Sequence, residues 1–123
     1  MPAVQSLFYQ EPGELPPVLD WLESLATQPR TRAEYAIGRL AAEGHELRRP
    51  LADTLRDGIY ELRVTYQSQQ NRILYYFDGQ GLVILAHGLK KEARVPDAAI
   101  ELALARRERY RAEPAAHSVE VDL

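Results

Sequence analysis

The stretch DGIYELRVTYQSQQNRILYYFDGQGLVILAHGLKK, residues 57–91, decides the fold. Side chains along 59–66 alternate, with Tyr60, Leu62, Val64 and Tyr66 on one face and Glu61, Arg63 and Thr65 on the other. This alternation is typical of a half-buried strand. Residues 72–77 alternate as well, and 82–87 are nearly all apolar, as in a central strand. Turn-forming residues separate the segments. We therefore predict strands near 59–67, 71–77 and 82–87, joined by hairpins into an antiparallel sheet.

The residues before this stretch predict one more strand and two helices. Residues 4–9 are short and able to alternate, which indicates a strand. Pro16 and Pro17 lead into a helix whose apolar face is formed by Val18, Trp21, Leu22 and Leu25. Thr31 and Glu34 have the spacing of a capping box, which predicts the start of a second helix there, and Gly44 is a suitable end for it.

The residues after the stretch predict a helix and a tail. Pro96 opens a helix over roughly 96–111, with an apolar face for packing. Residues 112–123 carry too little apolar area to offset the entropy of ordering them, so we expect a disordered tail. The predicted organisation is one domain over 1–111 followed by the tail 112–123. Helices grouped around hairpin-linked strands indicate an α+β fold.

Composition excludes several kinds of site and location. Hydrophobic residues make up 46% of the 123 residues, which is enough for a core. The chain contains no cysteine, which rules out disulfides, thiolate metal sites and a cysteine nucleophile. Its three histidines are far apart in sequence, so we expect no metal site and no cofactor. We see no signal peptide and no segment apolar enough to span a membrane, and we expect a cytoplasmic protein.

The charge distribution permits a nucleic-acid partner in spite of the net charge of -3. Residues 1–29 and 112–123 contain acids but no Lys or Arg. Residues 30–111 hold all 15 basic residues against 11 acidic ones, a net charge of +4. A mildly basic central segment with acidic ends allows RNA binding without demonstrating it.

Cationic residues recur along the predicted sheet. Arg63 lies on the polar face of its strand, Arg72 opens the next strand, and Lys90 and Lys91 follow the third. If neighbouring strands pair in sequence order, these four converge on one concave surface, which Arg48, Arg49 and Arg56 extend as candidate RNA-binding residues. A simpler interpretation is a solvated charged face, in which Glu61 serves only as an ion-pair partner for Arg63.

A convergent cationic cluster suits metal-free cleavage of RNA. The 2′-hydroxyl attacks the adjacent phosphorus, and negative charge grows on the phosphate oxygens. Fixed Arg and Lys donors stabilise that charge more strongly in the transition state than in the ground state. A general base for the 2′-hydroxyl and an acid for the 5′-oxygen complete such a site.

Two segments of the sequence resemble the core of HigB-type toxins of the RelE/ParE superfamily, in particular the phage-derived members. They are DGIYELRVTYQSQQNRILYYF and ILAHGLKKEARVP. The upstream segment EGHELRRPLADTLRDG is similar to a third conserved segment of the same toxins. The resemblance covers roughly residues 14–111, and the order and spacing of its pieces make it fairly specific.

The resemblance implies a RelE-like fold: a small curved antiparallel β-sheet with two N-terminal helices and one C-terminal helix, packed on one side. It implies the toxin of a type II toxin–antitoxin system, acting as a ribosome-associated mRNA endoribonuclease. It also implies a cognate helix-turn-helix, HigA-like antitoxin as partner. By resemblance, Arg63, Arg72, Lys90 and Lys91 form the phosphate-binding and catalytic set, with Glu61 as a candidate member.

Two alternative functions remain open from the sequence. A ParE-like toxin would bind gyrase through the same surface without cleaving RNA. An inactive phage-derived remnant would keep the fold alone. The ELR and KK sequences favour the endoribonuclease.

Overall fold

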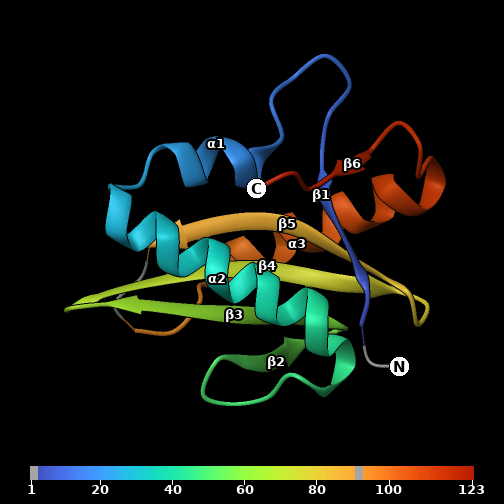
Figure 1. Ribbon diagram of the computed structural model, residues 1–123. Coiled ribbons are helices and arrows are strands. Elements are labelled where there is room, and N and C mark those ends of the chain that lie inside the picture. The colour runs from blue at the N-terminus through green and yellow to red at the C-terminus, as the bar shows by residue number, and fades with distance from the viewer. Residues whose placement is uncertain (1–2, 91–92) are drawn as a thin grey trace.

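The computed structural model describes residues 3–90 and 93–123. Over these residues the chain forms a six-stranded sheet in the order β2-β3-β4-β5-β1-β6, together with three α-helices (Figure 1). In chain order the elements are β1 (Gln5–Tyr9), α1 (Pro17–Glu23), α2 (Thr27–Glu43), the 3-10 helix η1 (Gly44–Glu46), β2 (Ala52–Arg56), β3 (Ile59–Tyr66), β4 (Gln69–Asp78), β5 (Leu82–Lys90), α3 (Asp97–Ala112) and β6 (Ser118–Glu120).

The predicted hairpins are confirmed. Strands β3, β4 and β5 pair antiparallel in sequence order. Two other strands, β1 inside the sheet and β2 at its edge, differ from the expectation. Strand β1 pairs with β5 in parallel, which the crossover through α1 and α2 permits. Strand β2 was not predicted, because its sequence ADTLR is short and largely polar, as edge strands often are.

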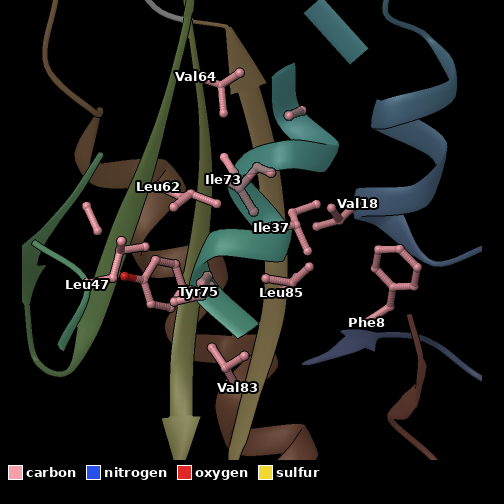
Figure 2. Close-up of a cluster of buried hydrophobic side chains, with 14 of the residues drawn as sticks. Phe8, Val18, Ile37, Leu47, Leu62, Val64, Ile73, Tyr75, Val83 and Leu85 are labelled. Atoms are coloured by element: carbon pink, nitrogen blue, oxygen red, sulfur yellow. The ribbon is translucent and has the colours of Figure 1, made fainter. Parts of the chain in front are cut away.

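The two faces of the sheet carry separate apolar cores. On one face, α1 and α2 cover a cluster that includes Leu62, Ile73 and Leu85, and Figure 2 shows Ile37 and Val18 reaching it from the helices. On the other face, α3 covers Ile59, Leu74, Tyr76 and their neighbours. The expectation that all helices pack on one side is therefore wrong. The strands β3 and β4 carry apolar side chains on both faces, so each face needs a covering helix.

Helix α2 begins four residues earlier than predicted. It starts at Thr27, and no side chain caps its N-terminus. Thr31 lies inside the helix, where its hydroxyl donates to the carbonyl of Thr27 (2.9 Å), so the predicted capping box is wrong. Pro29 falls in the first turn, where a missing N–H costs nothing. The helix ends at Gly44, as predicted, and this residue has a φ of 55°.

The tail is ordered where disorder was expected. Residues 118–120 form β6, antiparallel to β1, with Val119 opposite Phe8. The His117 ring stacks on Tyr9 at 5.6 Å between centroids. The prediction of disorder considered only the apolar area of the tail itself. It did not consider the backbone hydrogen bonds that the tail can form with the edge of β1.

In the parts of the chain that the structure describes, no helix is long and apolar enough to cross a membrane.

Candidate active site

Arg63 and Arg72 are neighbours on one face of the sheet. They are direct cross-strand partners in the antiparallel pairing of β3 with β4. Side chains at such positions point to the same face. Because Ile59 and Leu74 on these strands belong to the core beneath α3, the two arginines lie on the face that α3 covers. The predicted placement of this pair on one surface agrees with the structure.

Glu61 lies between the two arginines and contacts both. Its Oε2 accepts a hydrogen bond from Nη2 of Arg63 (3.1 Å). Its Oε1 lies 2.5 Å from Nε of Arg72, in a charge contact that lacks the geometry of a directed hydrogen bond. The side chains of Glu61 and Arg72 are only 7% and 9% exposed, whereas that of Arg63 is 35% exposed. The Arg72–Glu61 pair is therefore a buried ion pair, and Arg63 joins it from the solvent side.

A cavity of about 740 Å³ opens beside this triad. It is bounded by β2, β3, β4 and the start of α3. Its lining residues are Leu55, Arg56, Glu61, Arg63, Arg72, Ala93, Arg94, Val95, Asp97 and Ile100. Among the described lining residues, four arginines against two carboxylates give a formal charge of +2. A concave surface of this sign attracts anions.

The cations in the cavity differ in how far they are already neutralised. Arg56 contacts Glu101 (2.7 Å), Asp57 (2.7 Å) and Asp97 (3.1 Å), and these carboxylates raise the pKa of its guanidinium. Arg94 is exposed and forms no ion pair with any residue that the structure describes. Arg56 thus joins β2 to α3 through ion pairs, while Arg94, which is unpaired among the described residues, can meet an incoming anion.

Three buried donors in the triad lack a hydrogen-bond partner among the described residues, and one of them, Nε of Arg72, has only its charge contact with Glu61. Over residues 3–90 and 93–123, neither Nη1 of Arg72 nor Nε of Arg63 has a hydrogen-bond acceptor. A buried polar group without a partner costs free energy, and a ligand that supplies an acceptor recovers it. A phosphate presents oxygens that match the planar fork of a guanidinium.

The predicted cationic set is only partly brought together. Arg72 is paired with Leu89 across β4 and β5, so Leu89 shares its face and Lys90 points to the opposite one. There Lys90 lines a separate cavity beside the junction of α1 and α2. The expectation that Lys90 joins Arg63 and Arg72 is therefore wrong. Lys91 lies outside the described residues.

The arginines upstream of the meander also separate. Arg48 donates to the backbone carbonyls of His45 and Leu47 and lines a cavity on the α2 face. Arg49 is largely exposed and pairs with Asp53 (2.8 Å). Of the three predicted RNA contacts, only Arg56 reaches the cavity of the triad. Sequence reasoning missed Arg94, although its position just before Pro96 placed it at the start of the last helix.

Residues 20–108, well over half of the chain, match the family model of the phage-derived protein Gp49-like. The chain belongs to the Gp49-like family. This family is of the RelE/HigB-like toxin type, which agrees with the resemblance seen in the sequence at that level. No curated protein matches the chain. Both members of the arginine pair and Glu61 fall within the Gp49-like match.

Proposed function

We propose that this protein is the toxin of a type II toxin–antitoxin pair and cleaves mRNA without a metal ion. The observation that carries the proposal is the triad of Glu61, Arg63 and Arg72 on the wall of a cationic cavity. Membership of the Gp49-like family supports the toxin type. The proposed partners are mRNA on the ribosome and a helix-turn-helix antitoxin.

Each member of the triad has a distinct role in this proposal. Arg72 is held rigidly by Glu61 and the sheet, and its unpartnered Nη1 supplies a donor for the scissile phosphate. Arg63 is more exposed and adds a second fork to the same phosphate. Preorganised donors of this kind stabilise charge that develops in the transition state at little reorganisation cost.

Glu61 is the candidate general base. One carboxylate oxygen contacts each arginine, which fixes the group beside the position of the phosphate. In the proposed step, Glu61 takes the proton of the 2′-hydroxyl, the oxygen attacks phosphorus, and the 5′-oxygen departs with a proton from an acid yet to be assigned. The products are a 2′,3′-cyclic phosphate and a 5′-hydroxyl.

The test is inducible expression in bacteria with RNA ends mapped before and after induction. We expect growth arrest with new mRNA ends for the wild type. Arg63→Gln is expected to lower cleavage at least about a hundredfold, the usual scale for one charge-stabilising donor. Arg30→Gln, which removes a cation from an exposed pair on α2, is the matched control and should leave cleavage unchanged.

Two outcomes would count against the nuclease. Growth arrest with intact mRNA and a DNA-damage response would indicate a gyrase-directed toxin. Normal growth at a confirmed level of folded protein would indicate an inactive remnant of the fold.

A further inference from the structure

A second surface, far from the arginine triad in the fold, has the features of a protein-binding groove. It lies between α2 and the β1–β6 edge and encloses about 620 Å³. Its lining includes the apolar residues Tyr35, Ile37, Val121 and Leu123. Tyr35 is 64% exposed and Leu123 50% exposed, although both are large apolar side chains. Exposed apolar residues gathered in one concavity typically mark an interaction site.

We propose that this groove, here called the α2–β6 groove, binds an extended, basic segment of a partner protein alongside β6. The proposal is independent of the nuclease proposal, because the two cavities share no lining residue. Three features of the groove carry it: its charge, its free strand edge and a buried hydroxyl.

The charge of the α2–β6 groove selects a cationic partner. Its charged lining residues are Glu34 and Glu120, and neither Lys nor Arg contributes to the lining described here. Glu34 is partly neutralised by Arg30 (3.0 Å), while Glu120 has no ion-pair partner among the described residues and accepts a hydrogen bond from the side-chain amide of Gln5 (3.3 Å). A second copy of this chain docked symmetrically would bring the same acids face to face, which disfavours self-association through this groove. RNA is disfavoured by the same charge.

The strand edge selects an extended segment. Hydrogen bonds join Gln10 to His117 and Val121 to Ser6, so the alternation of an antiparallel pair turns Ser118 and Glu120 away from β1. Strand β6 is the last strand of the sheet over the described residues (Figure 1), so no strand lies beside the outward N–H and C=O groups of these two residues, although the carbonyl of Ser118 already accepts a hydrogen bond from the side-chain amide of Gln10 (3.4 Å). An added strand would pair with these groups and direct every second side chain toward Tyr35 and the groove.

The floor of the groove holds a polar atom without a partner. The hydroxyl oxygen of Ser6 is buried and makes no hydrogen bond to any described residue. A lysine or backbone donor of the incoming segment would give this oxygen a partner, which adds a polar contact to an otherwise apolar floor.

The experiment measures binding of two fluorescein-labelled synthetic peptides by anisotropy. One alternates valine and lysine over about ten residues, and the other alternates valine and glutamate. We expect only the basic peptide to bind the wild type, with an affinity that falls as salt rises. The double variant Tyr35→Ser with Leu123→Ser should weaken binding by about tenfold or more. Leu15→Ser, equally exposed at 51% but outside the groove, is the control and should bind like the wild type.

Hydrogen exchange of the protein with the basic peptide bound locates the peptide-binding site. Protection of residues 118–123 and of the 31–41 segment of α2 supports the α2–β6 groove. Equal binding by all variants, equal binding of the acidic peptide, or protection elsewhere would overturn the proposal. A dimer in sedimentation that Tyr35→Ser dissociates would overturn it too, because the occupant would then be a second copy.

Discussion

Gly88 on β5 lies directly against Trp21 of α1, and replacing it with alanine tests this packing. A Cβ built at this position would lie 2.3 Å from Cδ2 of Trp21 and 2.5 and 2.6 Å from two further atoms of the indole. Contacts below 3.0 Å are not tolerated, so either the indole or the strand must move. The sequence contains a single tryptophan, so tryptophan fluorescence reports on the surroundings of this one indole.

The expected cost of Gly88→Ala follows from two opposing effects. Overpacking a well-packed core costs about 1–3 kcal/mol. Alanine in place of glycine in a strand recovers roughly 0.5–1 kcal/mol of backbone entropy. The clash is with a rigid ring and not with the end of a flexible side chain, so we expect a net loss of about 1–2 kcal/mol in the free energy of unfolding.

Urea unfolding followed by fluorescence and circular dichroism measures this loss. Gly38→Ala on α2 is the matched control, because nothing lies within 4 Å of its added Cβ, and it should stabilise the protein by about 0.5–1 kcal/mol. Combining Gly88→Ala with Trp21→Leu should relieve the clash, so the two costs should fall short of additive by about 1 kcal/mol when unfolding is followed by circular dichroism, because the double variant has no tryptophan. Strict additivity, or a neutral Gly88→Ala, would refute the reasoning.

Three further predictions concern the triad, acid stability and the tail. Arg72→Ala leaves Glu61 buried with only Arg63 as partner, so calorimetry should show a loss of about 3 kcal/mol in the free energy of unfolding. Arg72→Lys should keep more of the stability and still lose RNA cleavage. An unchanged melting temperature for Arg72→Ala would contradict the buried ion pair. The hydrogen bond from Tyr9, with Arg109 and His117 nearby, lowers the pKa of Glu11 below its ordinary 4.5. The ionised Glu11 therefore contributes to the free energy of unfolding above that pH, and this contribution is lost as the pH falls through the pKa of the folded state. Glu11→Gln should therefore flatten the acid limb of stability against pH, and a parallel curve would argue against this. Deleting residues 114–123 removes β6 and uncovers β1, which should cost about 1–3 kcal/mol in urea unfolding; an unchanged midpoint would mean that β6 adds no stability.

The strands of the meander could be predicted because their signal is local. Each strand of residues 57–91 carries its own alternation or apolar run, and each turn between them carries its own turn-forming residues. The partnership of Arg63 with Arg72 followed from the same alternation once the hairpin was assumed. The apolar faces of α1 and α3 were likewise visible in the spacing of their side chains.

The positions of Lys90, Arg94 and β6 depended on tertiary structure. Lys90 was predicted to join Arg63 and Arg72 because it follows the third strand. The face that it occupies is set by the pairing of Arg72 with Leu89, and the register between β4 and β5 shifts near Leu74. Arg94 reaches the cavity only because α3 packs across the sheet.

By itself, the sequence determined the α+β class, the hairpin meander and the pairing of Glu61 with Arg63 on one strand face, since periodicity along a strand requires no knowledge of distant contacts. Only the tertiary structure decided that β1 enters the sheet parallel to β5, that the tail adds the edge strand β6, and that the ion pair of Glu61 with Arg72 is buried. These features depend on contacts between residues far apart in the chain. Their free energy comes from backbone groups and charges that find partners only when the whole sheet has formed.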